Sequence, residues 1–427
     1  MHIHDASARR KEITTKRFHY AFLILLVCSS MSLTVGITYN TSGIFFPSVV
    51  KELGVSNGTL ALYMMGVGLF SCAFLPVAGR LMKGGHIRLL LSIIALIHAL
   101  ATASMALFTN VYHFYIASVF LGLSMAFFFY VAVPTLISRW FVHNVGFYVG
   151  FSFAFTAGGA VVFNPIAAFV IANYGWRMGY ASMGLCSFIL IFIPVLLFAR
   201  DSPEEIGLKP YGTEKESERK VDARLTGASA SDVLKSMTIV PVLVYMVAIA
   251  LFASLLLYLP SFAHSKGMGM SLLAAISSMA MVGALLGKVA FGAMSEKAPI
   301  ATLAICGSSG VIGTLAMLYI TSIPAFFLAG GFLYGIAYSS CTVQSALLVK
   351  RIYGLRCYSQ IYSAIMMVYA LSTAVGKSLW GFIADHQGGN FTLSFWLVAF
   401  LSAVFALSSI VALLMKKRVV WTGPEKA

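Results

Sequence analysis

The sequence predicts an all-α membrane protein with twelve transmembrane helices in two bundles of six. The first observation is composition: the chain has 427 residues, of which 59% are hydrophobic and only 10% charged. The second is that twelve apolar segments each reach the roughly 20 residues that a helix needs to cross a hydrocarbon core. The third is the placement of Lys and Arg, which fits an even number of crossings. These segments also lack the alternating polarity of membrane β-strands.

The apolar segments follow one another through short connections, except in the middle of the chain. The stretch 200–236 is polar and rich in Lys, Arg and Glu. It divides the chain into an N-terminal bundle (1–199), a central loop (200–236) and a C-terminal bundle (237–427). The expected spans are 20–42, 59–80, 88–108, 112–136, 145–172, 178–199, 239–263, 271–294, 300–320, 324–348, 358–384 and 392–415.

Basic residues predict the orientation. Of the 29 Lys and Arg, 24 fall in pieces on the same side as the N-terminus, three in loops on the other side, and two inside spans. Cytoplasmic loops of membrane proteins carry such an excess of positive charge. Both termini are therefore expected in the cytoplasm, and the protein in the cell membrane with a lipid bilayer around it. The net charge of +15 has this explanation, so nucleic acid is not expected as a partner.

Other classes of function lack support in the sequence. None of the six cysteines forms a Cys-x-x-Cys pair, which argues against a metal or disulfide framework. The chain shows no nucleophile–base cluster and no phosphate-binding loop. We therefore expect no metal, no cofactor and no enzyme activity, and we expect a monomer. The first apolar segment is longer than the core of a cleaved signal peptide, so it is interpreted as a retained helix.

Two Gly-Lys-x-x-x-Gly units hold the two basic residues inside spans. One comprises Gly287, Lys288 and Gly292, and the other Gly376, Lys377 and Gly381. A lysine in hydrocarbon is costly and by default marks a functional site. The two units occupy the middle spans of two three-helix sets that run in opposite directions, as in an inverted repeat. Lys288 is nearer the cytoplasmic end of its span and Lys377 nearer the outer end.

No carboxylate is available deep in the membrane to neutralise these lysines. All 14 Asp and Glu fall in tails, loops or helix ends. Two ammonium groups about 6 Å apart at an effective dielectric constant of about 20 would repel by roughly 2.8 kcal/mol. We therefore expect the counter-ion to be the substrate, a small carboxylate. The alternative is that both side chains extend to the membrane surface, but flanking glycines at this spacing favour close packing and an inward face.

The organisation resembles the major facilitator superfamily over nearly the whole chain. Two six-helix halves joined by a long loop fit that fold, as does the turn from Gly292 through Glu296 and Lys297. A related turn begins at Gly79 and Arg80, but Lys83 stands where the family usually has aspartate. The resemblance implies that these two turns control gating, through Gly79, Arg80, Gly292, Glu296 and Lys297.

A narrower set of motifs is similar to the oxalate:formate antiporter and monocarboxylate transporter branch. These motifs run from Tyr130 through Trp140 to Asn164-Pro165, with Gly36 to Tyr39 in the first span. The resemblance implies that Lys288 and Lys377 bind the substrate carboxylate. Aromatic residues in spans that line the site in this superfamily complete the expected cavity: Tyr39, Tyr130, Tyr334, Tyr338 and Trp380.

Coupling is expected to be anion exchange. Proton-coupled monocarboxylate carriers resembling this chain have an aspartate one turn before the cation, where this sequence has Ala284. His98 is the one histidine deep in a span, and a lone core histidine is more often structural. An empty site with two positive charges would reorient poorly, which favours exchange. A proton-linked monocarboxylate symporter and an exporter of other small molecules are the alternatives.

Overall fold

In the computed structural model, residues 19–82, 86–142, 145–212, 228–229, 233, 236–354 and 358–419 are described. Within these ranges the chain is helical and contains no β-strand. The longer helices are α1 (Ala21–Thr34), α2 (Ser42–Leu53), α3 (Asn57–Leu81), α4 (Ile87–Ser104), α5 (Val111–Met125), α6 (Val133–Trp140), α7 (Val145–Ser187), α8 (Ile193–Phe198), α10 (Ile239–Ser254), α11 (Leu259–Ser265), α12 (Met270–Lys297), α13 (Pro299–Tyr319), α14 (Pro324–Tyr338), α15 (Val343–Tyr353), α16 (Tyr358–His386) and α17 (Thr392–Leu414).

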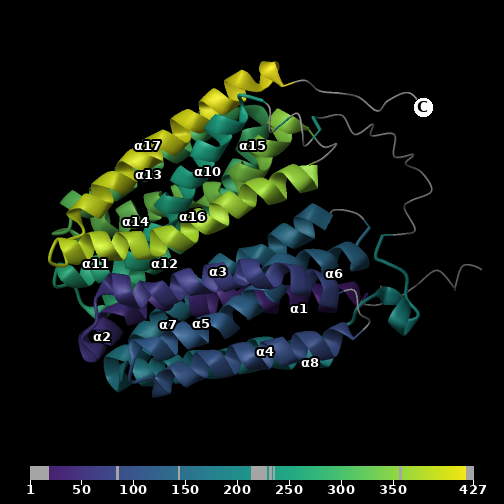
Figure 1. The fold of residues 1–427 in the computed structure, drawn as a ribbon, viewed down its shortest axis with the longest axis horizontal. Coiled ribbons are helices and arrows are strands. Elements are labelled where there is room, and N and C mark those ends of the chain that lie inside the picture. The colour runs from purple at the N-terminus through teal and green to yellow at the C-terminus, as the bar shows by residue number, and fades with distance from the viewer. Residues whose placement is uncertain are drawn as a thin grey trace, which may run out of the picture.

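The helices lie in two groups, one above the other in Figure 1. Helices α1 to α8 form the first group and α10 to α17 the second, and we call them the N-half and the C-half. Most helices run along the long axis of the molecule. The start of α1, the end of α8 and the end of α17 lie together at one end, here called the tail end. The opposite end, which carries α2 and α11, is called the far end.

Ten helical segments within the described ranges are long and apolar enough to cross a membrane. Several observed helical segments extend past the ends predicted from the sequence. The first covers Ala21–Leu53 and consists of α1, a π-helical turn η2 (Val35–Tyr39) and α2. One segment, Val145–Phe198, has 54 residues. It is interrupted at Gly175, whose φ of 83° is left-handed, a conformation that glycine adopts without strain.

A second π-helical turn, η4 (Ala126–Ala132), joins α5 to α6. Insertions of this kind are rare in helices and often occur at functional sites. The turns η2 and η4 both belong to the N-half. Each contains one of the tyrosines predicted to line the site, Tyr39 in η2 and Tyr130 in η4.

The two halves are in close contact at the far end. The Asp385 carboxylate near the end of α16 accepts hydrogen bonds from the first-turn amides of α3, at 3.1 Å from Asn57 N and 2.7 Å from Gly58 N. A Cβ on Gly381 of α16 would lie 2.7 Å from the Gly58 Cα, so neither position has room for a side chain. Toward the tail end, α3 and α6 diverge from α15 and α16 (Figure 1). The far end is thus closed.

Candidate functional site

Lys377 lies on the side of α16 that faces the N-half. Its neighbours on that side, three residues before and four after, are Ala374 and Gly381, which share a helical face with it. Ala374 contacts α3 at Gly68, where an added Cβ would lie 2.8 Å from the Ala374 Cβ, and Gly381 contacts α3 at Gly58. The Lys377 side chain is partly buried. Lys377 therefore belongs to the surface between the halves.

Lys288 has a corresponding position on α12. Met281, seven residues before it, packs with Ala157 and Ala160 of α7, and Leu285, three residues before it, packs against the same cluster. These residues share a helical face with Lys288. Lys288 is also partly buried. Both lysines thus lie on faces that the C-half presents to the N-half, as the flanking glycines predict.

The glycines of the two units pack as expected at three of four positions. A Cβ on Gly287 would lie 2.7 Å from the Ser339 Oγ, and one on Gly376 would lie 2.4 Å from the Ser254 Oγ. Gly381 approaches α3 as described above. At Gly292 an added Cβ would meet nothing within 4 Å, so the last glycine of the first unit does not serve close packing.

The two lysines lie at different levels along the molecule. Lys288 is nine residues from the tail-end terminus of α12, and Lys377 is nine residues from the far-end terminus of α16. With a rise of 1.5 Å per residue and helix ends at equal heights, their Cα atoms differ in level by about 14 Å. At that separation and an effective dielectric constant of about 20, the repulsion is about 1.2 kcal/mol. This is less than half the value expected for two charges in one pocket.

Cys341 and Tyr369 show which parts of the neighbouring helices lie at the same height along the molecule as Lys288. The Cys341 thiol lies near the Lys288 side chain and near the Tyr369 hydroxyl. Tyr369 precedes Lys377 by eight residues on α16, about 12 Å along the axis. The agreement with the estimate from helix ends supports two separate levels. Sequence reasoning missed Tyr369, although its spacing of two turns from Lys377 places both on one face.

Neither lysine has an anionic partner among the described side chains. Neither ammonium group makes a hydrogen bond or an ion pair there. The acids whose side chains are described are Glu52, Asp201, Glu204, Glu205 and Asp385, all near helix ends or in the segment after α8. Asp385 binds the start of α3, Glu52 pairs with Arg177, and Asp201 pairs with Arg139. An incoming anion would therefore meet two uncompensated positive charges.

Three of the predicted aromatic residues direct their polar atoms at backbone. The Tyr39 hydroxyl donates to the Leu121 carbonyl at 2.6 Å, and the Tyr334 hydroxyl to the Phe252 carbonyl at 2.7 Å. The Trp380 Nε1–H contacts the carbonyl of Leu251 and the hydroxyl of Ser254, each at 2.9 Å. In this conformation these three residues join neighbouring helices of their own half. Their predicted contact with substrate stays a prediction, and it requires these bonds to change.

Tyr130 and Tyr338 are placed differently. Both are partly buried. Tyr338 packs beside the small cluster formed by Ala157, Ala160 and Met281, where α7 meets α12. Tyr130 lies within the π-turn η4 and contacts the Phe129 ring edge to face. Of the five aromatic residues, these two retain hydroxyl groups that no described backbone carbonyl engages.

His98 joins three helices of the N-half. It is fully buried, with Nε2 at 3.0 Å from the Thr38 hydroxyl and Nδ1 at 2.9 Å from the Ser124 hydroxyl. The Ser124 hydroxyl donates to the Leu121 carbonyl, so it accepts from Nδ1–H and leaves Nε2 as an acceptor for Thr38. Both ring nitrogens are satisfied in the neutral form, as the structural interpretation of this histidine expects.

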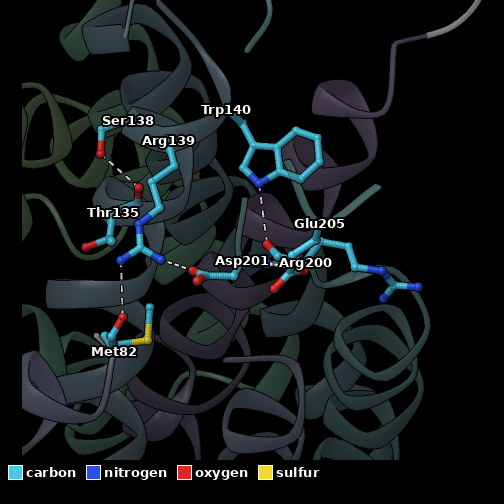
Figure 2. Close-up of polar contacts among 8 residues, drawn as sticks. All are labelled: Met82, Thr135, Ser138, Arg139, Trp140, Arg200, Asp201 and Glu205. Carbon is cyan, nitrogen blue, oxygen red and sulfur yellow. Dashed lines mark hydrogen bonds and ion pairs between the residues drawn. The ribbon is translucent and has the colours of Figure 1, made fainter. Parts of the chain in front are cut away.

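Equivalent arginines hold the tail end of each half. Figure 2 shows Arg139 at the end of α6, which donates to the Met82 carbonyl at 3.2 Å and pairs with Asp201. Arg351 near the end of α15 donates to the Ser295 carbonyl near the end of α12. Each arginine thus places positive charge at the carboxyl end of the second long helix of its half, where the helix dipole favours it. These contacts therefore correspond between the two halves.

The predicted gating residues also lie at the tail end. Arg80 and Lys297 are exposed, at the ends of α3 and α12. Gly79 has open space around it, as Gly292 does. The side chain of Glu296 and the whole of Lys83 lie outside the described residues. Their role in gating stays a prediction.

Solved structures of several transporters share this fold. The nucleoside transporter NupG matches with a TM-score of 0.69 at 12% identity, covering 92% of this chain and 99% of that one. The xylose transporter XylE from E. coli gives 0.66 at 16%, covering 94% and 98%. A bacterial homologue of the human lysosomal transporter Spinster gives 0.63 at 14%, covering 93% and 95%. At these identities the likeness shows the fold alone.

A comparison with curated protein sequences found no match. The sequence model of the Major Facilitator Superfamily matches residues 25–376, which is most of the chain. The all-helical architecture and the structural neighbours agree with that match. The chain therefore belongs to the Major Facilitator Superfamily of membrane transporters.

Proposed function

We propose that this transporter carries small organic anions, mono- or dicarboxylates, and that Lys288 and Lys377 neutralise them. The observation that supports this proposal is that both lysines lie on helix faces between the halves and make no hydrogen bond or ion pair with a described side chain. An ammonium group without a partner in a low-dielectric interior is costly. A carboxylate on the transport route removes that cost at each lysine in turn.

The proposed topology has twelve crossings with both termini in the cytoplasm. The 54-residue segment Val145–Phe198 is long enough for two crossings and is interrupted at Gly175. Helix α16, with 29 residues, adds one more to the ten candidate spans. The excess of Lys and Arg at the tail end supports its assignment to the cytoplasmic side of the cell membrane. We propose domain boundaries at 1–199 and 237–427 around the loop 200–236, and a monomer as the working unit.

The mechanism we propose is alternating access with exchange of one anion for another. The halves rock about the site, which is the general mode of such carriers. Without substrate, the site between them holds two ammonium groups, and closing the halves around those charges is unfavourable. A bound anion lowers this barrier in both directions, so return of the empty carrier is slow and exchange is fast.

The test combines binding and transport. Purified protein is heated with formate, acetate, glycolate, oxalate or succinate, and a binder is expected to raise the melting temperature while choline does not. In vesicles at equal internal and external pH, unlabelled carboxylate inside is expected to accelerate uptake of the labelled acid. Lys288→Met and Lys377→Met are expected to remove this uptake without loss of membrane-inserted protein. Uptake that persists in both variants would refute the role of the lysines, and uptake that requires a proton gradient would favour the symporter.

A further inference from the structure

Four glycines near the tail end lie within helices but have no neighbour to pack against. An added Cβ would meet nothing within 4 Å at Gly79 of α3, at Gly146 and Gly150 of α7, or at Gly292 of α12. A glycine inside a helix is less favourable than an alanine, because it loses more backbone freedom on folding. In the conformation described, these four glycines therefore carry a cost without a packing contact that requires them.

Gly146 and Gly150 lie on the face of α7 that contacts the C-half. Ala157 of that face packs with Met281 of α12. Gly150 precedes Ala157 by seven residues and Gly146 precedes it by eleven. With 3.6 residues per turn, both glycines lie within about 20° of Ala157 around the helix axis. The face that contacts α12 thus continues toward the tail end, where it is open.

Gly292 has the matching position on α12. It follows Leu285 by seven residues and Met281 by eleven, so it lies within about 20° of both around the helix axis. Leu285 and Met281 pack where α12 meets α7. Each of the two helices therefore presents glycine toward the other, beyond the point where their contact ends.

The three glycines also lie at similar heights. The two helices run in opposite directions, and the Ser278 hydroxyl of α12 donates to the Val161 carbonyl of α7 at 3.5 Å. From this contact toward the tail end, Gly292 is about 21 Å away along α12. Gly150 is about 16.5 Å and Gly146 about 22.5 Å away along α7. Gly292 therefore lies opposite the turn between Gly146 and Gly150.

The contact between α3 and α16 has the same form. At Gly68 of α3, an added Cβ would lie 2.8 Å from the Ala374 Cβ of α16. Gly79 follows Gly68 by eleven residues, so it lies on the same face of α3 but nearer the tail end. Two separate contacts between the halves thus continue toward the tail end as open faces that carry glycine.

We propose that these open faces are the contact surfaces of a second conformation, in which the tail end closes and α7 packs on α12 through Gly146, Gly150 and Gly292. This inference rests on the proposed movement of the halves but not on the identity of the substrate. Small residues allow membrane helices to approach closely. Closure extends a contact that already exists near Ala157, and in the same movement Gly79 extends the contact of α3 with α16.

The experiment measures disulfide formation in vesicles between Gly146→Cys and Gly292→Cys, in a protein whose six native cysteines are replaced. The oxidant is copper phenanthroline, and the product is identified by the mass of the linked peptides. The pair is expected to react, because closure brings the two positions within the short range that a disulfide requires. The control pair is Phe147→Cys with Gly292→Cys. Phe147 is next to Gly146 but is 69% exposed and lies about 100° away around α7, so this pair should react more slowly.

A bulky residue within the proposed contact should oppose closure. In the two-cysteine protein, Gly150→Leu is expected to slow disulfide formation roughly 10- to 100-fold, because overpacking disfavours the closed state. Its melting temperature should equal or exceed that of the parent, because the position is open in the conformation described and leucine favours helix. Gly158→Leu is the matched control. Gly158 is also open but lies about 100° from Ala157 around α7, so the rate should not change.

The outcomes separate this proposal from the proposed function. If the control pair reacts as fast as the pair at 146 and 292, or if neither pair reacts, α7 does not close on α12 through these glycines. If Gly150→Leu leaves the rate unchanged, Gly150 is not part of the contact. In these cases carboxylates that stabilise the protein still support the proposed function. If no carboxylate does so but the disulfide forms as expected, the contact stands without that function. Gly150→Ala is measured alongside, so that a folding defect in the leucine variant does not decide the result.

Discussion

Removal of the Asp385 side chain is expected to open the far end of the transporter. In the closed arrangement its carboxylate accepts two backbone hydrogen bonds from the other half, at 3.1 and 2.7 Å, and it lies at the positive end of the α3 dipole. Hydrogen bonds to charged groups are worth about 1.5–3 kcal/mol each when buried. Because Asp385 is partly exposed, solvent screening reduces their sum, and we take about 2 kcal/mol. Asp385→Ala should thus shift the closed–open equilibrium about 30-fold toward the open state.

The shift is measured as a change in the distance distribution between two spin labels in a protein whose native cysteines are replaced. The labels are placed at residue 51, in the last turn of α2, and at residue 266, which ends α11, so that they report on the far end from opposite halves. The variant should populate a longer distance that the parent lacks. Asn390→Ala is the matched control, because Asn390 caps α17 within the C-half through the Thr392 amide at 2.9 Å. If Asp385→Ala leaves the distribution unchanged, or if Asn390→Ala alters it equally, the far-end contact does not hold the halves together.

Two further predictions concern side chains that join helices within each half. Arg139→Gln and Arg351→Gln should each lower stability by about 1 kcal/mol, because each loses a charge at a helix carboxyl end. Scanning fluorimetry should show similar decreases in melting temperature for the two variants. If neither variant shows a decrease, these contacts do not stabilise the tail ends of the two halves. His98→Leu should lower stability by about 1–3 kcal/mol, because it leaves the buried Thr38 hydroxyl without a partner and removes the bond that the Ser124 hydroxyl accepts. The pH dependence of anion uptake should remain as in the wild type, and a changed pH profile would contradict the structural interpretation of His98.

The membrane architecture was predictable because it depends on patterns that tertiary contacts do not override. Apolar length gives the spans, and the all-helical fold follows because backbone groups in hydrocarbon must be paired within the segment. Helix ends were less predictable. The first predicted span ended at residue 42, whereas helix continues to Leu53, because α2 is shielded by α7 and α11 rather than by lipid alone. No local pattern signals such shielding.

For the candidate site, the sequence could predict only which residues are costly to bury. Lys288 and Lys377 were identified because a charge in hydrocarbon requires a reason, and their levels follow from their distances to the span ends. Side-chain direction was not available from the sequence. The hydroxyls of Tyr39 and Tyr334 point to the Leu121 and Phe252 carbonyls, which belong to other helices. The two π-turns likewise depend on packing between helices.

The different levels of the two lysines bear on how an anion would cross. A single small carboxylate between them would need both side chains to extend toward each other across about 14 Å of helix rise. Lys288 lies toward the tail end of α12, and Lys377 lies toward the closed far end of α16. An anion entering from the tail end would meet Lys288 first and would reach Lys377 only as it moved inward. The ion would then pass from one ammonium to the other as the halves rock. Under the proposed exchange mechanism, each lysine would be left uncompensated whenever its anion departed without replacement.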